Sequence, residues 1–422
     1  MSKQEINDTW SGSIDNYKMV VEGCDWGPGV TALIIDLGDE KVVPAEINMN
    51  DFEVSVLCQK MDSTGTTTCE YEQRVILSVY ASDAEGNKIS EFAAHITVEL
   101  EVSPNFGNPF FFDKEKMGNN WSDPYEHRIS YKGIKFVPKR INKLMPLTDL
   151  FDINGKFTGS DGEELLYAAY SPDTDDKRPL IIWLHGLGEG SMDGVANPEI
   201  ALLGNRVTRF VDDEIQGLMG GAHVLVPQAS TFWMDEGTFG NDRQPTTTGY
   251  SRYETALTEL LKEFIANNQN IDLNRVYISG CSNGGFMTLR MMFLNPEMFA
   301  GAIPICHGYH EDWLTEEKIE SIKAIPIWIV HTKNDDALRY EKTAQPLYER
   351  LIAAGAENIF FTLDENVVDR TGLYFDEEGN PYEYNGHLSW IHPLNNDTEM
   401  KIAGEVVSIF KWLSMQKRNL KG

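Results

Sequence analysis

The sequence is short of basic residues and has no long apolar segment, and each shortage excludes a class of protein. Only 36 Lys and Arg stand against 65 Asp and Glu among 422 residues, so the formal net charge is −29. Binding to nucleic acid or to an anionic membrane surface needs clustered basic side chains, so the sequence predicts neither partner. No stretch approaches the roughly 18 consecutive apolar residues of a membrane-spanning helix.

Cysteine is also scarce, with five residues in the chain. An odd and sparse set does not make a disulfide framework. The N-terminal sequence MSKQEIND has no apolar core of a signal peptide. Both observations favour a reduced, cytoplasmic protein, with secretion as the alternative if a leader has been removed. Hydrophobic residues make up 41% and charged residues 24%, which is typical of a globular chain.

The first third of the chain has the pattern of half-buried strands. Apolar and polar residues alternate over Ile96–Val102 and over Val75–Val79, and Val30–Leu37 is a more continuous apolar run. Short strands joined by turns, without a convincing helix, predict an all-β domain at residues 1–140. An immunoglobulin-like sandwich and an unspecified β fold are equal alternatives on this pattern.

From residue 141 to residue 422, short apolar runs alternate with segments of helical periodicity. Two such segments are Tyr253–Phe264 and, near the C-terminus, Ile402–Leu413. The alternation predicts a mostly parallel sheet with helices on both faces. Six runs are expected to be its buried strands: Leu180–Leu184, Val224–Val226, Val276–Ile278, Ala302–Ile305, Ile327–Val330 and Ile359–Leu363.

The strongest chemical signal is the sequence GCSNGG at residues 280–285. It follows an apolar strand and precedes the helical stretch Phe286–Leu294, which is the setting in which G-x-S-x-G forms a sharp strand-to-helix turn. The glycines let the backbones approach each other, and the helix amides favour a developing negative charge. The motif predicts Ser282 as a catalytic nucleophile. A tight turn without chemistry is the alternative.

A serine nucleophile needs a base, normally a histidine that a carboxylate orients. The chain order expected in such a fold is serine, acid, histidine. The strand at 327–330 runs out into a polar turn, so Asp335 is the predicted acid. Asp336 is the alternative, and Asp364 and Glu365 after the next strand are less favoured.

Two histidines follow that acid, His387 and His392. His387 lies in a glycine-flanked loop before the last predicted helix, where the base of such a triad belongs. Pro393 restricts the backbone of His392, which ranks second. The sequence therefore predicts His387 as the general base.

A glycine-rich loop with the sequence LHGLGEG follows the first buried strand at residues 184–190. Its glycines allow the loop to turn its amides inward. An oxyanion hole needs two backbone N–H donors, and we predict those of Leu187 and Asn283, with Gly186 as the alternative to Leu187. His185 precedes the serine in the chain and is interpreted as a structural brace of the loop.

Two tryptophans, Trp233 and Trp390, are candidate walls of the substrate pocket, with packing as the alternative for both. His307 and His310 are a close histidine pair, but their spacing is not by itself a zinc signature. The sequence predicts no metal and no cofactor.

Together, the segments 184–190, 280–287, 331–335 and 386–390 resemble the α/β-hydrolase superfamily. They look like bacterial esterases of the prolyl-oligopeptidase-like and polyhydroxybutyrate-depolymerase-like group, some of which carry an immunoglobulin-like N-terminal domain. The resemblance implies an α/β-hydrolase fold and a carboxylesterase with Ser282, Asp335 and His387 as its triad. The chain departs from its relatives at Thr332, where they usually carry Gly, and at residues 337–338, where many have Val-Pro.

The first hypothesis is a serine carboxylesterase for small to medium acyl esters, including carbohydrate-linked acetyl or feruloyl esters. The second is a peptidase of the prolyl-oligopeptidase type, although about 140 N-terminal residues are too few for a propeller of ~40-residue blades. The third is a passive hydrolase scaffold whose β domain binds a glycan or a partner. The sequence does not predict the oligomeric state.

Overall fold

The computed structural model describes residues 16–38, 42, 44–61, 67–113, 118–132, 134–136, 140–190, 197–237 and 246–418. The expectation about a signal peptide concerns the N-terminal residues and lies outside these ranges. The chain divides into two compact units. One is Met1–Phe112 with Asn120–Asp149, and the other is Asp113–Asn119 with Leu150–Gly422.

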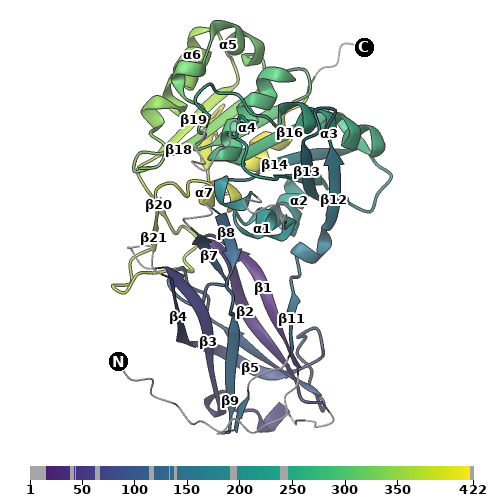
Figure 1. Ribbon diagram of the computed structural model, residues 1–422, viewed down its shortest axis with the longest axis vertical. Helices are drawn as coiled ribbons and strands as arrows, with labels where there is room; N and C mark the ends of the chain where they lie inside the picture. The colour runs from purple at the N-terminus through teal and green to yellow at the C-terminus, as the bar shows by residue number, and fades with distance from the viewer. Residues whose placement is uncertain are drawn as a thin grey trace. The chain divides into compact units, whose positions relative to one another are not determined.

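The N-terminal unit is an all-β immunoglobulin-like domain with a five-stranded and a four-stranded sheet (Figure 1). The first sheet has the order β11-β1-β2-β6-β5 and the second β10-β9-β3-β4. The strands are β1 (Asn16–Cys24), β2 (Gly27–Asp36), β3 (Phe52–Met61), β4 (Thr67–Arg74), β5 (Ile76–Ser82), β6 (His95–Leu100), β9 (Glu126–Tyr131), β10 (Ile134–Phe136) and β11 (Arg140–Leu144). A separate hairpin joins β7 (Phe110–Asp113) to β8 (Gly118–Trp121).

Alternation along the strands produces the core of this domain. In β3, the side chains of Val54, Val56 and Cys58 are buried, while those between them are more exposed. Successive strand residues point to opposite faces, so the same period places one apolar face inward. The strands predicted near residues 30, 75 and 96 are present as β2, β5 and β6. The predicted inward face of the second run is wrong, because Val75 and Leu77 are 49% and 60% exposed where the register of β5 shifts between Ile76 and Ser78.

The second unit is built on an eight-stranded sheet with the order β12-β13-β15-β14-β16-β17-β18-β19. The first two pairings are antiparallel and the remaining strands run parallel. The strands are β12 (Asp152–Thr158), β13 (Glu164–Tyr170), β14 (Arg178–Leu184), β15 (His223–Ala229), β16 (Ile271–Cys281), β17 (Gly301–Ile305), β18 (Ile327–Thr332) and β19 (Ile359–Asp364). All six predicted strands are therefore present, and five of them are buried along the predicted run. The sixth, β19, is only partly buried after Ile359, because it lies at the edge of the sheet.

Helices cover both faces of this sheet, as predicted (Figure 1). The chain moves one way along the sheet from β14 to β15 and the other way from β16 onward, and right-handed crossovers then put the connecting helices on opposite faces. Accordingly, α2 packs against α8, whereas α3, α4, α5 and α6 contact one another in succession. The helices are α1 (Pro198–Leu203), α2 (Asp213–Met219), α3 (Glu254–Asn267), α4 (Asn283–Leu294), α5 (Glu316–Ile322), α6 (Ala344–Ala353), α7 (Ile391–Leu394) and α8 (Ile409–Ser414).

The helix predicted over Ile402–Leu413 is wrong in its first half. Strands β22 (Glu399–Ile402) and β23 (Glu405–Ser408) form a hairpin there, and α8 begins only at Ile409. The two residues between the strands, Ala403 and Gly404, have positive φ values of 52° and 93°. Such a turn matches the twist of a tight hairpin and ends any helix.

The boundary between the units also lies later than the sequence suggested. Strand β11 (Arg140–Leu144) pairs in parallel with β1 and so extends the first sheet beyond residue 140. The second unit begins again at Leu150.

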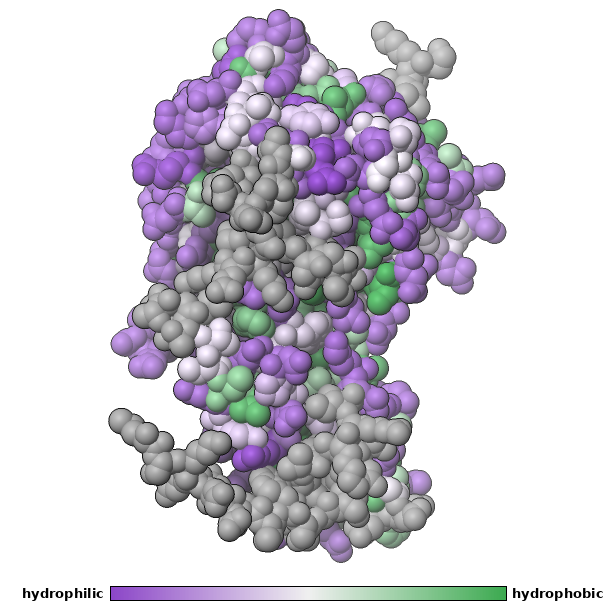
Figure 2. All heavy atoms as spheres, viewed as in Figure 1, coloured by the Kyte–Doolittle hydropathy of each residue, from purple (hydrophilic) through white to green (hydrophobic). Residues whose placement is uncertain are grey.

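The described surface that one view shows is mainly hydrophilic. Figure 2 shows one face of the molecule, on which hydrophilic side chains predominate and hydrophobic ones lie scattered. Within the ranges described above, none of the helices is long and apolar enough to cross a bilayer.

Candidate active site

Ser282 lies at the sharp turn between β16 and α4. Its backbone has φ 55° and ψ −114°, a strained conformation for a residue with a side chain. The turn is held because the Ser282 N–H donates to the Ile305 carbonyl at 2.9 Å. A Cβ atom on Gly280 or Gly284 would overlap the carbonyl oxygen of Leu184, so both positions require glycine. The fold thus presents the half-buried Ser282 at the carboxyl end of the sheet.

A chain of two hydrogen bonds joins three side chains from separate loops. Ser282 Oγ lies 2.9 Å from Nε2 of His387, and Nδ1 of His387 lies 2.8 Å from Oδ2 of Asp335. The Asp335 side chain has no exposed surface, whereas that of His387 is 21% exposed. The structure therefore brings together the serine, histidine and aspartate that the sequence singled out, with His387 facing both partners.

Asp335 is held by donors on each oxygen. Oδ1 accepts the backbone N–H groups of Ala337 and Leu338, both at 2.9 Å. Burial alone would raise the pKa of Asp335, but hydrogen bonds from His331 and His387 outweigh burial and hold this pKa well below its ordinary value. The carboxylate is therefore ionised at neutral pH. One donor comes from Leu338, where a proline would have no N–H.

The loop that carries His387 is fixed from several sides. The Thr332 hydroxyl donates to the carbonyl of Gly386, so the residue at which the chain departs from its relatives anchors this loop. A side chain at Gly386 would overlap Asn334, which explains the glycine. The ring of Trp390 stands edge-on to the His387 ring, with centroids 6.0 Å apart. No local pattern predicts the contribution of Thr332, because it depends on a contact across 54 residues.

The alternative acid and base lie elsewhere. Asp336 is exposed, next to the buried Asp335. His392 pairs with Asp364 instead, with Nδ1 3.1 Å from Oδ2, and its Nε2 lies 2.9 Å from the carbonyl of Val368. Neither ring nitrogen of His392 faces a hydroxyl nucleophile.

The predicted oxyanion loop lies against the serine turn. Leu187 begins a short 3₁₀ turn, Leu187–Glu189, and Asn283 is the first residue of α4. His185 braces this loop as expected. Its Nδ1 lies 2.6 Å from the Gly186 carbonyl, and its Nε2 accepts the N–H of Ala229 at 3.1 Å. Burial lowers the pKa of His185 to about 4, so the ring stays neutral.

Glu189, in the same loop, is a buried carboxyl group that the sequence analysis missed. It is 4% exposed, and its Oε1 accepts a hydrogen bond from Asn119 at 2.7 Å. Burial raises the pKa of Glu189 to about 7. A side chain on Gly204 would overlap Glu189, so this glycine makes room for the carboxyl group beneath the loop.

Trp233 is packed rather than exposed. Its side chain has no exposed surface, and its ring centroid lies 4.9 Å from that of His185. The backbone N–H of Trp233 donates to Asn283 Oδ1 at 2.6 Å. This geometry favours packing, the alternative reading of Trp233, and it ties the segment after β15 to the serine turn. Trp390 is 8% exposed and supports His387 from the side.

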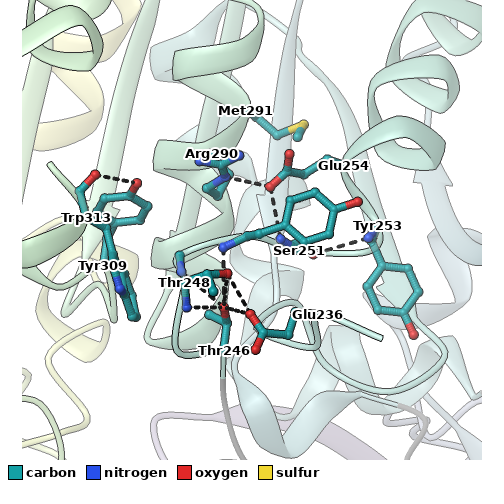
Figure 3. Close-up of polar contacts among 12 residues, drawn as sticks. Glu236, Thr246, Thr248, Ser251, Tyr253, Glu254, Arg290, Met291, Tyr309 and Trp313 are labelled. Atoms are coloured by element: carbon teal, nitrogen blue, oxygen red, sulfur yellow. Dashed lines mark hydrogen bonds and ion pairs between the residues drawn. The ribbon is translucent and has the colours of Figure 1, made fainter. Parts of the chain in front are cut away.

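Two polar clusters lie near the start of α3 (Figure 3). Glu236 accepts the hydroxyl groups of Thr246 and Thr248, each at 2.7 Å. Further along, Glu254 at the start of α3 pairs with Arg290 of α4 at 2.6 Å. The Glu254–Arg290 pair joins α3 to α4 and so supports the helix that begins at the serine turn.

One set of side chains has the composition of a metal site. Cys306, Asp335 and His387 each offer a ligand atom within 4.8 Å of the others. Asp335 and His387 already hydrogen-bond to each other, and burial raises the pKa of the Cys306 thiol to about 12. His307 and His310 each accept a backbone N–H, from Tyr309 and Asp312 respectively.

The strand order and the serine turn place the second unit among the α/β hydrolases. Residues 167–364 match the phospholipase/carboxylesterase family, and residues 16–135 match the esterase Ig-like N-terminal domain. The second unit therefore contains a phospholipase/carboxylesterase domain, and the protein is a carboxylic ester hydrolase.

Individual relatives are more distant. A solved structure of a thermostable esterase is similar over 96% of this chain and 100% of its own, with a TM-score of 0.74 at 23% sequence identity, which shows a shared two-domain fold. Poly(3-hydroxyalkanoate) depolymerase C of Paucimonas lemoignei is 45% identical over 51 residues. That segment is 11% of this chain and 12% of the depolymerase, so the chain matches a small part of that protein.

Proposed function

We propose that this protein hydrolyses carboxylic esters with Ser282 as nucleophile, His387 as general base and Asp335 as the acid that orients the base. The observation that supports this most strongly is the unbroken hydrogen-bond chain from Ser282 Oγ through both nitrogens of His387 to Asp335. Such a chain is what activates a serine hydroxyl.

In the proposed reaction, Ser282 Oγ bonds to the ester carbonyl carbon while its proton moves to Nε2 of His387. The carbonyl oxygen takes the negative charge and accepts the N–H groups of Leu187 and Asn283. His387 then gives the proton to the leaving alkoxide as the C–O bond breaks, and the alcohol departs. Water repeats the attack on the acyl-serine, which releases the carboxylic acid and restores Ser282.

Neutral acyl esters of small to medium size are the proposed substrates, including acetyl or feruloyl groups linked to carbohydrate. A net charge of −29 disfavours anionic esters and speeds the departure of the carboxylate product. The triad proposed here uses no metal and no cofactor.

The test is the substitution Ser282→Ala, assayed with p-nitrophenyl acetate and with a fluorophosphonate probe. We expect kcat to fall by roughly 10⁴-fold or more and labelling to disappear, because the nucleophile is gone. Ser279→Ala is the matched control, since Ser279 is a buried serine whose hydroxyl donates to Ile303. Activity retained by a folded Ser282→Ala protein would refute the proposal, and faster cleavage of a peptide anilide than of the ester would favour a peptidase.

A further inference from the structure

A second histidine lies against the proposed triad acid. His331, in β18, has a side chain with no exposed surface. Its Nε2 lies 2.8 Å from the Leu338 carbonyl oxygen and 3.3 Å from Oδ2 of Asp335. That Oδ2 atom is the one that also meets His387. One carboxylate oxygen therefore lies between two histidine rings.

The partners of His331 identify its tautomer. A backbone carbonyl only accepts hydrogen bonds, so Nε2 of His331 must carry the proton that it shares with Leu338. Its Nδ1 is buried and has no hydrogen-bond partner among the described residues. A proton on that nitrogen would be an unsatisfied buried donor, so the ring is neutral with its hydrogen on Nε2.

This arrangement closes the turn that bears the acid. The Leu338 N–H binds Oδ1 of Asp335, and the Leu338 carbonyl binds His331, so the turn is held from both sides of one residue. Nε2 of His331 also lies 3.3 Å from Oδ2 of Asp335, so its hydrogen is shared between the Leu338 carbonyl and this carboxylate oxygen. The side chain of Asp335 therefore cannot rotate without losing contacts on both oxygens.

We propose that His331 is a positioning residue that fixes which oxygen of Asp335 meets His387 and limits the negative charge available on that oxygen. It acts through Asp335 and does not touch the substrate. This inference rests on the proposed function, because it assumes that Asp335 and His387 work as a pair.

Other groups that face this pair are also buried or fixed. Burial lowers the pKa of His307 to about 3, so His307 is neutral. Cys306 lies beside Asp335 as a neutral thiol. On the outer side, Tyr340 stacks edgewise near the His331 ring at 6.4 Å, and Glu341 lies within electrostatic range. Among these groups, only Asp335 bonds both histidines.

The test compares His331→Phe, which removes the donor, with His331→Gln, whose amide nitrogen replaces it. Without the shared hydrogen bond, Asp335 Oδ2 holds the His387 proton more tightly. The acidic limb of kcat/KM should then move to higher pH by up to about one unit, since a hydrogen bond to a charged group is equivalent to roughly a tenfold change in an equilibrium constant. KM should stay unchanged, and His331→Gln should return the limb towards its wild-type position.

His223→Phe is the matched control, because His223 is another fully buried histidine whose ring meets a hydrogen-bonding side chain, that of Ser171. The His223→Phe substitution should lower the stability of the protein without shifting the acidic limb of kcat/KM. A limb in folded His331→Phe that coincides with the wild type, or that lies at lower pH, overturns the inference. If Ser282→Ala retains activity, the proposed function fails instead, so the two failures are distinguishable.

A second measurement needs no activity. In protein labelled with ¹⁵N-histidine, the His331 signals, assigned by their loss in His331→Gln, should show a protonated Nε2 and an unprotonated Nδ1 at neutral pH. The opposite tautomer could not donate to Leu338 or Asp335 and would overturn the inference even if both variants failed to fold well enough for kinetics.

Discussion

Two aspartate–histidine pairs form between the same two regions of the chain, and one of the two pairs contacts Ser282. Asp335 follows β18 and pairs with His387, while Asp364 ends β19 and pairs with His392. Nδ1 of each histidine faces the carboxylate. The pairs differ at Nε2, because that of His387 meets the hydroxyl of Ser282 and that of His392 meets the carbonyl of Val368.

That difference separates a catalytic geometry from a structural one. A hydroxyl can donate or accept, so His387 can take a proton from Ser282 and return it. A carbonyl and a carboxylate only accept hydrogen bonds, so the neighbours of His392 give it no hydroxyl proton to take up. Arg370 donates a second hydrogen bond to Asp364 at 2.9 Å. The second pair is therefore built for stability.

The largest effect should come from exchanging each histidine for glutamine. His387→Gln removes the proton acceptor, so we expect kcat to fall by roughly 10⁴-fold or more with little change in stability. His392→Gln should leave kcat within about threefold and lower the free energy of unfolding by about 1–3 kcal/mol, because it weakens a buried charged hydrogen bond. Initial rates on p-nitrophenyl acetate and urea denaturation measure the two effects. The comparison breaks if His392→Gln loses as much activity as His387→Gln.

The next effect concerns acid stability. Burial would raise the pKa of Asp364, but its hydrogen bond to His392 and the charge of Arg370 outweigh burial and lower this pKa. A group with a depressed folded pKa stabilises the protein above its unfolded pKa of about 3.9 and loses that contribution as the pH falls through the folded value. Asp364→Asn should therefore cost about 3 kcal/mol at pH 7, since it leaves His392 without its partner.

The difference between wild type and Asp364→Asn should shrink as the pH falls below about 4, because Asp364 then takes up a proton first in the unfolded chain and, at lower pH, in the folded protein. Denaturation curves at pH 7, 5 and 3 check this. Asp335→Asn serves as the contrasting variant, since it should lose about 10⁴-fold in kcat, whereas Asp364→Asn stays active. A stability difference that is constant with pH would show that Asp364 contributes by packing alone.

Local pattern accounts for what the sequence predicted well. The serine turn is a motif whose glycines are required by contacts a few residues away, and the buried strands are continuous apolar runs. Asp335 and Asp364 both lie at the end of such strands, and His387 and His392 both come later in the chain. The sequence favours His387 over His392 because Gly386 precedes it, whereas Pro393 restricts the backbone of His392. The partners of His331 and Thr332 lie in other loops, so no periodic pattern in the sequence predicts these contacts. At Ile402–Val406, the same apolar spacing suits a helix or a hairpin, and the Ala403–Gly404 turn decided it.

The smallest expected effect concerns the hydroxyl of Thr332 next to the His387 loop, compared with a hydroxyl on β19 near Asp364. Thr332→Val keeps the shape of a fully buried side chain but removes the hydroxyl that donates to Gly386 beside His387. We expect a loss of about 1 kcal/mol in stability and a roughly three- to tenfold lower kcat, because the base is positioned less firmly. Thr362→Val is the matched control on β19, where the hydroxyl accepts from Trp328 at 2.8 Å. It should cost similar stability and leave kcat unchanged. Equal losses of kcat in the two variants would mean that the Thr332 contact stabilises the sheet edge in general and does not specifically position His387.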